Sequence, residues 1–249
     1  MANKIFPQRW VLIRGLTRSY FHWFDFTDLL KQELSLSKIE TPEIAGNGYL
    51  FEKDSPLTIE DAVLELRKQI SSIDEPVGII GISLGGILAV KWALDFPDEV
   101  SHLVLINSSF SMSPFYQRLR PQHYLSIFKI AVLASAEEIE NTVFNITCNS
   151  KKWQPFLNKS IDFQKKYPVS LKNLIRQLAL AAQSDFEYKP KCDVLILTSK
   201  NDKLVDHSCS LAIAKKWDAA IHIHPTAGHD LSMDDSEWII EKIKTLFNF

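Results

Sequence analysis

The sequence places one serine, one aspartate and one histidine in an order that suits nucleophilic catalysis. Ser83 lies in the stretch Gly-Ile-Ser-Leu-Gly (81–85), between an apolar run and a helical pattern. A serine on such a tight strand-to-helix turn needs small neighbours, because its backbone is strained and the helix packs close. Its hydroxyl becomes a good nucleophile only when a base accepts its proton and a carboxylate orients that base. The motif therefore predicts that Ser83 is a nucleophile.

The best candidates for the base and the carboxylate each follow an apolar run. His229 lies in Ala-Gly-His-Asp (227–230), after the last of these runs, and Asp202 directly follows the run before it. The carboxyl ends of parallel strands meet at one edge of a sheet, so both side chains are expected near Ser83. We predict that His229 is the general base and that Asp202 orients it.

Other residues could fill the same roles. Asp206 is the alternative acid, four residues beyond Asp202. His222 and His224 lie near His229, but alternation along an edge or late strand faces both one way and favours structural roles. Three further acids are expected to be solvated charges or helix-start residues: Asp230, Asp234 and Asp235.

The elements that would position these residues alternate between short apolar runs and helical patterns, as in a parallel sheet with crossover helices. Six strands are expected, near residues 10–13, 36–41, 77–82, 102–106, 194–197 and 220–223. Helical spacing covers residues 59–73, 84–96, 135–145, 171–183 and 236–247. The fold class is therefore α/β, with about six mostly parallel strands and helices on both faces.

The stretch between the fourth and fifth strands is too long for a loop. It contains helical patterns and many aromatic residues, and we interpret it as a helical lid over residues 113–191, inserted into a core of residues 1–112 and 192–249. Phe144 and Trp153 are candidates for contact with a substrate, although aromatic residues of this kind also form a lid's own core.

With these features the chain resembles the α/β-hydrolase superfamily over essentially its whole length. The resemblance depends on the turn at Ser83, the loops carrying Asp202 and His229, the Gly-Asn-Gly turn at 46–48 and the lid. Within the superfamily it resembles the pimeloyl-acyl-carrier-protein methyl ester esterases of biotin synthesis and related small-ester carboxylesterases. This implies a serine carboxylesterase that works through an acyl-enzyme, with neither a metal nor an organic cofactor.

The resemblance also implies an oxyanion hole made of the backbone N–H groups of Leu84 and Leu16. Many relatives carry His-Gly-x after the first strand, whereas this chain has Arg14-Gly15-Leu16, so Leu16 takes the donor role by position. Arg14 either braces the loop through hydrogen bonds or reaches an anionic substrate. His22, a few residues further on, is expected to help close that loop.

Net charge, apolar runs and cysteine content limit the partners and the location that we expect for the protein. The net charge of -2 gives no reason to expect nucleic acid binding, and no apolar run is long enough for a membrane span or a signal peptide. Three cysteines without metal or redox spacing favour a reducing, cytoplasmic location. The predicted lid holds 12 Lys and Arg against 6 Asp and Glu, so it could attract an acyl carrier protein. The excess could equally be a solvated surface.

The same residues leave other activities open. Thioesters and carbon–carbon bonds beside a ketone are cleaved by the same kind of triad, and a lidded pocket can also serve as a ligand receptor without catalysis. A carboxylic-ester hydrolase is the leading hypothesis.

Overall fold

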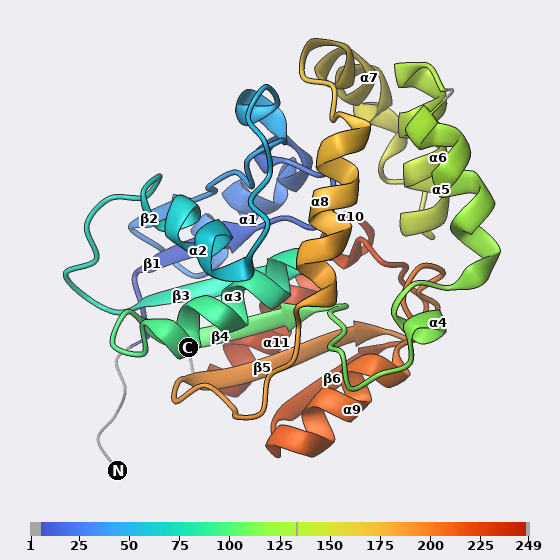
Figure 1. Ribbon diagram of the computed structural model, residues 1–249. Helices are drawn as coiled ribbons and strands as arrows, with labels where there is room; N and C mark the ends of the chain where they lie inside the picture. The colour runs from blue at the N-terminus through green and yellow to red at the C-terminus, as the bar shows by residue number, and fades with distance from the viewer. Residues whose placement is uncertain (1–5, 133, 248–249) are drawn as a thin grey trace.

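The core of the molecule is a six-stranded sheet in which every pair of neighbours is parallel (Figure 1). A computed structural model describes residues 6–132 and 134–247. The strands, in the spatial order β2-β1-β3-β4-β5-β6, are β1 (Arg9–Ile13), β2 (Lys38–Glu40), β3 (Val77–Ile82), β4 (Val100–Ile106), β5 (Asp193–Ser199) and β6 (Ala220–His224). This confirms the predicted fold class. The chain order reverses between β2-β1 and β3, which leaves the carboxyl ends of β1 and β3 beside each other at a switch point.

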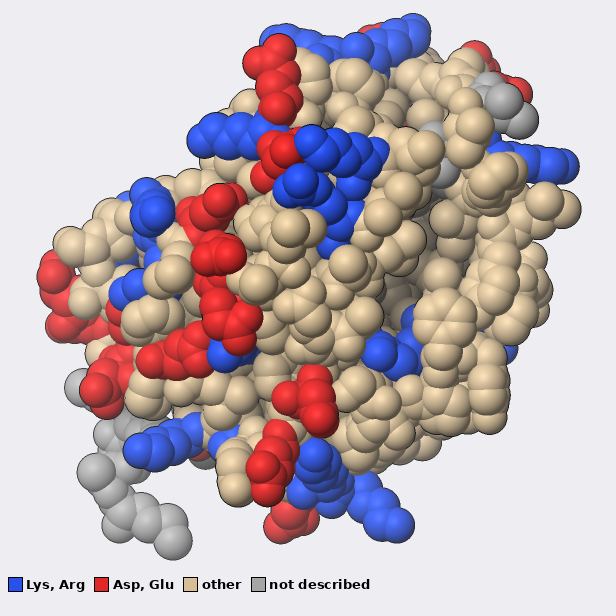
Figure 2. All heavy atoms as spheres, in the orientation of Figure 1, with Lys and Arg blue, Asp and Glu red and all other residues tan. Residues whose placement is uncertain are grey.

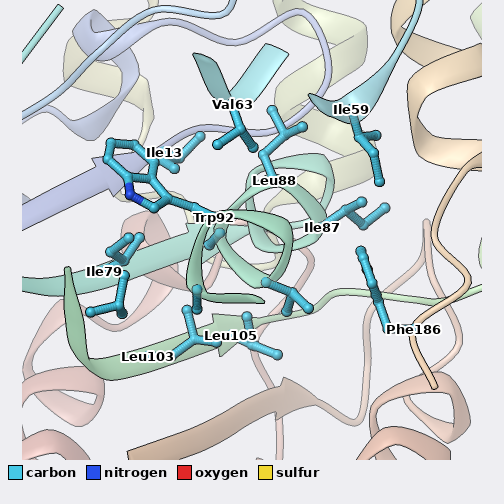
Figure 3. Packing of buried hydrophobic residues seen from close by; sticks show 14 of the residues in the cluster. Ile13, Ile59, Val63, Ile79, Ile87, Leu88, Trp92, Leu103, Leu105 and Phe186 are labelled. Atoms are coloured by element: carbon cyan, nitrogen blue, oxygen red, sulfur yellow. The ribbon is translucent and has the colours of Figure 1, made fainter. Parts of the chain in front are cut away.

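Alternate residues of the buried strands face opposite layers of helices, as the two-residue period of a strand requires. Val11 and Ile13 point into one hydrophobic cluster, while Trp10 and Leu12 point into the other. Figure 3 shows the first cluster, where Trp92 and other residues of a core helix pack onto the sheet. Each such fully buried side chain stabilises the fold by roughly 1.5–3 kcal/mol relative to exposure.

The core helices cover both faces of the sheet. Their bounds are α1 (Phe26–Glu33), α2 (Ile59–Arg67), α3 (Leu84–Asp95), α9 (Ser208–Trp217), α10 (Leu231–Asp234) and α11 (Ser236–Phe247). Helices α2, α3 and α9 pack into the first cluster, and α1 and α11 into the second. Two short 3-10 helices, η1 (Tyr20–Trp23) and η2 (Gly48–Leu50), follow β1 and β2.

The stretch between β4 and β5, which we call the β4–β5 insertion (residues 107–192), is helical. Its helices are α4 (Phe115–Arg118), η3 (Pro121–His123), α5 (Tyr124–Val132), α6 (Ala136–Thr147), η4 (Gln154–Phe156), α7 (Leu157–Lys166) and α8 (Leu171–Ala182). Figure 1 shows α5, α6 and α7 to one side of the sheet, with α8 returning in front of α3. None of the helices among the described residues is long and apolar enough to cross a bilayer.

Candidate active site

Ser83 occupies the turn between β3 and α3, and its backbone is strained. Its φ of 55° and ψ of -118° lie in a region that L-residues rarely adopt, at a cost of order 1–3 kcal/mol. The turn persists because it is held closely: the Ser83 N–H donates to the Ile106 carbonyl at 2.9 Å. A Cβ on Gly85 would collide with the carbonyl oxygen of Ile13, so the helix can approach β1 only with glycine there. The sequence motif therefore folds as the tight turn that it predicted.

His229 and Asp202 are brought together as their spacing after β6 and β5 predicted. The Nδ1 atom of His229 lies 2.7 Å from Oδ2 of Asp202, and both side chains are buried. The other carboxylate oxygen of Asp202 accepts the backbone N–H groups of Leu204 at 2.7 Å and Val205 at 3.0 Å. A carboxylate fixed in this way keeps the Nδ1 of the imidazole protonated and leaves Nε2 free to accept a proton.

The alternative acid is engaged elsewhere. Asp206 pairs with Arg120 at 3.0 Å and accepts the backbone N–H of Ser208. His224 pairs with Asp235 at 3.1 Å, so these two residues support each other beside α11.

Asn107, at the end of β4, holds the loop that carries His229. Its Nδ2 donates to the His229 carbonyl at 2.8 Å, and its Oδ1 accepts the Ser199 N–H at 2.8 Å. Asn107 has a φ of 48°, and asparagine is one of the few residues that tolerate this conformation. The side chain thereby ties the ends of β4 and β5 to the histidine loop. The residue type after a buried strand was the only sequence signal for this role.

Ser83 and His229 line one cavity of about 560 Å³ between the core and the β4–β5 insertion. Leu16 and Leu84 line it too. Among the described residues, no acceptor is found for the backbone N–H of either leucine, and the Leu84 N–H stands at the start of α3. Most of the remaining wall is aliphatic and comes from α5, α6 and α8. Figure 2 shows a hollow between α8 and α5.

Arg14 forms a buried ion pair beside this site. Its two terminal nitrogens contact the carboxylate of Asp230 at 2.6 and 3.2 Å, and Ser232 completes the cluster. Burial by itself would raise the pKa of Asp230, but the Arg14 guanidinium holds it below its usual value. Asp230 does precede the short helix α10, but the expectation that it is solvated is wrong. It is wrong for Asp234 as well, because that buried carboxylate accepts the Gly228 N–H at 2.6 Å.

A second buried ion pair joins the loop after β1 to the insertion. Arg18 donates to both carboxylate oxygens of Glu140, on α6, at 2.9 Å. Gln177, on α8, accepts the Thr17 N–H at 2.9 Å. Burial and the neighbouring Arg18 lower the pKa of His22 well below its usual value, so this imidazole is neutral. These partners are 122 and 160 residues apart in sequence, which is why no local pattern announced them.

Phe144 and Trp153, the two candidates for substrate contact, lie outside the cavity wall. Their rings stack on each other with centroids 5.0 Å apart in a small cluster with Cys148 and Met233. Phe144 is fully buried and Trp153 is 5% exposed. The structure therefore places both in the insertion's own core, which was the alternative interpretation of these aromatics.

The parallel sheet, the strained turn at Ser83 and the contact of His229 with Asp202 are typical of an α/β hydrolase. Comparison with known families agrees. The model of the alpha/beta hydrolase family matches residues 10–242, so the chain belongs to that family.

Among curated relatives, "Putative carbamate hydrolase RutD" of Shigella flexneri is 23% identical over 232 residues, covering 91% of this chain and 86% of the relative. The protein of the same name from Klebsiella pneumoniae (strain 342) is 22% identical, with coverages of 95% and 92%. The family and these relatives place the chain among hydrolases.

Two solved structures share the fold at low identity. The 2-hydroxy-6-oxo-6-phenylhexa-2,4-dienoate hydrolase of Rhodococcus sp. strain RHA1 aligns with a TM-score of 0.75 at 15% identity, covering 98% of this chain and 91% of that one. The enol-lactonase of Burkholderia xenovorans LB400 aligns with a TM-score of 0.76 at 14% identity, with coverages of 100% and 94%.

Proposed function

We propose that the protein is a serine hydrolase of carboxylic esters, with Ser83 as nucleophile, His229 as general base and Asp202 as the orienting carboxylate. The observation that carries this proposal is the 2.7 Å contact between His229 and Asp202, in a loop that lines the same cavity as Ser83. A buried carboxylate, an oriented imidazole and a half-buried serine on a strained turn that lines the cavity are the parts that acyl transfer requires.

In the proposed acylation, Nε2 of His229 takes the proton of the Ser83 hydroxyl as its oxygen attacks the ester carbonyl. The carbonyl oxygen becomes an oxyanion, which the N–H groups of Leu16 and Leu84 stabilise. The tetrahedral intermediate then collapses, the bond to the alcohol oxygen breaks, and His229 returns the proton to that oxygen. Arg14 acts in this scheme as the brace of the Leu16 loop, because Asp230 occupies its charge.

In the proposed deacylation, His229 takes a proton from a water molecule that attacks the acyl-enzyme. The acid product leaves when the bond to the Ser83 oxygen breaks and that oxygen regains its proton. No step calls for a metal or an organic cofactor.

The shape and polarity of the cavity favour an acyl substrate over a small polar one. A largely aliphatic cavity of about 560 Å³ suits a hydrocarbon chain, whereas a carbamate of a few polar atoms would make few apolar contacts with that wall. The finer proposal is an ester linked to an acyl carrier protein, such as pimeloyl-acyl-carrier-protein methyl ester, with the basic insertion as the docking face. A cytoplasmic location, expected from the cysteine pattern, stays a prediction.

The test is hydrolysis of p-nitrophenyl esters of two to twelve carbons by the wild type and by Ser83→Ala, at equal folded concentration. We expect at least a 10³-fold loss in the variant and a preferred chain length that reports the cavity. A serine-directed fluorophosphonate should label Ser83 of the wild type only.

The same assay with a thioester, an aryl carbamate and a vinylogous 1,5-diketone separates the competing chemistries. Faster turnover of one of these would replace the ester proposal. Tight ligand binding without turnover or labelling would point to a receptor instead.

A further inference from the structure

The charged residues that line the cavity do not balance. Arg14, Arg18 and Arg118 line it, together with the two acids Asp230 and Glu140. The first two arginines are each neutralised by one of these acids, at 2.6 and 2.9 Å. Both pairs are buried. The remaining cation is Arg118.

Arg118 has no acidic partner within the part of the chain that the structure describes. Its Nη2 donates to the carbonyl of Ala181 at 2.5 Å and to the hydroxyl of Ser184 at 2.7 Å, which caps the end of α8. Its Nε is buried without a partner, and its Nη1 forms no hydrogen bond to any described residue but is not fully buried. The Nη2 atom of the guanidinium is therefore held by hydrogen bonds, whereas Nη1 is free to donate to a ligand.

A structural role at the end of α8 does not use up this side chain. The cap needs only Nη2, and a neutral donor would supply it. Burial lowers the pKa of Arg118 below its usual value, which means that the surrounding wall does not solvate the charge. An anion entering the cavity would relieve that cost.

Arg118 reaches the cavity on the β4 side of the nucleophile. The hydroxyl of Ser108 donates to the Ser83 carbonyl at 3.1 Å, and three residues further on the Ser111 N–H donates to the carbonyl of Ser184. Ser184 is the residue that pins Arg118. Figure 2 shows basic side chains at the lower end of the hollow, between the positions of α4 and the lower end of α8 in Figure 1.

We propose that Arg118 binds a carboxylate at the far end of the acyl chain, so that the preferred substrate is a monoester of a dicarboxylic acid. This inference rests on the proposed ester hydrolysis at Ser83 and names a substrate class for it, in place of the carrier-linked ester, whose far end is a thioester without a free carboxylate. The ester lies at Ser83, the methylene chain contacts the aliphatic wall, and the terminal carboxylate accepts from Nη1. A single unpaired cation matches one negative charge, whereas a phosphate monoester would bring close to two.

The experiment compares kcat/KM for monomethyl esters of dicarboxylic acids, from succinate to sebacate, with that for methyl esters of monocarboxylic acids of equal length. At the best length we expect the carboxylate to raise kcat/KM by about tenfold or more, which is typical of one charge-assisted hydrogen bond. Arg118→Met should bring this ratio close to one, and Arg118→Lys should restore part of it.

The matched control is Arg120→Met. Arg120 lies two residues away, pairs with Asp206 and does not line this cavity, so its loss should keep the ratio of the wild type. Thermal melting of each variant shows whether the cap on α8 has been lost. Because the ratio compares two substrates on one enzyme, partial unfolding cancels from it.

A wild-type ratio near one, or a ratio that Arg118→Met leaves unchanged, overturns this inference. If neutral esters are then still cleaved in a Ser83-dependent way, the proposed function stands without it. If no ester is turned over, calorimetry on Ser83→Ala gives the answer directly. Monomethyl suberate must bind at least about tenfold more tightly with Arg118 than with Met at this position, and equal binding refutes the subsite.

Discussion

Two buried carboxyl groups contact residues of the loop after β1, and only one of them faces a positive charge. Asp230 faces the Arg14 guanidinium at 2.6 Å, whereas Glu43 is 1% exposed and its carboxyl group accepts, from the described residues, the Tyr20 N–H at 2.9 Å. Burial raises the pKa of Glu43 to about 8, because no cation among the described residues offsets the loss of solvation. One carboxyl group therefore stays charged at neutral pH, and the other holds its proton.

Replacing Asp230 by Asn should destabilise the protein by about 3–5 kcal/mol, because it leaves the buried charge of Arg14 without its counter-ion. The change should also lower kcat, because Asp230 follows His229 in the chain and Arg14 precedes the Leu16 loop. Urea unfolding and ester kinetics measure the two effects.

A double variant, Arg14→Met with Asp230→Leu, is the control for this ion pair. It removes both charges, so it should be less destabilised than Asp230→Asn. Equal unfolding free energies for wild type and Asp230→Asn would show that the pair does not brace the loop.

Glu43→Gln should change how stability depends on pH. The folded pKa of Glu43 is raised, so the folded state keeps a proton that the unfolded state releases above about pH 4.5. The free energy of unfolding of the wild type therefore falls as the pH rises toward 8, by up to roughly 1.4 kcal/mol per pH unit from this group.

Glutamine has no proton to lose, so its stability does not fall over this range. The free energy of unfolding of the variant minus that of the wild type should therefore be about 2–4 kcal/mol larger at pH 8 than at pH 5. Urea unfolding at both pH values measures this difference. A constant difference across the range would mean that Glu43 is ionised in the folded protein.

Between elements, the Arg18–Glu140 pair is the buried charged contact of α6 with the loop after β1. Glu140→Gln should leave Arg18 undercompensated, destabilise the fold by about 3 kcal/mol and make the β4–β5 insertion more sensitive to protease. Glu137→Gln on the same helix is the control, because that side chain is exposed and should change little. The idea fails if both variants are cleaved at the rate of the wild type.

Sequence patterns predicted the helices and strands that have a clear apolar periodicity or clear start and stop residues. The apolar run 77–82 is β3 residue for residue, and the pattern at 236–247 is α11. Helices α1 and α9 were missed: α9 buries small and polar residues such as Cys209 and Ser210, and α1 spans only two turns. Neither leaves an apolar stripe long enough to stand out from its surroundings.

At the site, the members that follow strands were predictable because strand ends share one edge of the sheet. The contacts that cross the fold were not. Asn107, the Arg14–Asp230 pair and the burial of Phe144 depend on which loops meet, and a single sequence does not contain that information.

At the scale of the whole molecule, charge is distributed unevenly. Figure 2 shows basic side chains along the top of the view, where Figure 1 places α7, and acidic side chains over α2 and its surroundings. Lys152 and Lys159 are exposed and pair with no acid among the described residues. Some other cations of the insertion are neutralised, as Lys172 is by Asp54 at 2.6 Å. The η4–α7 end of the insertion therefore carries part of its unpaired positive charge.

If an acidic carrier protein docks on this end, salt should weaken catalysis on a carrier-linked ester and leave a small ester nearly unaffected. Exposed charges are screened within a Debye length, about 10 Å at 0.1 M salt, so KM for the carrier ester should rise several-fold between about 0.05 and 0.5 M.

The paired variant Lys152→Glu with Lys159→Glu should raise that KM further at low salt and remove its salt dependence. Lys31→Glu, an exposed lysine on α1 outside the insertion, is the matched control. Because kcat depends on groups buried in the cavity, it should stay constant throughout. Equal salt dependence for both esters would mean that the basic surface is solvated and takes no part in recognition.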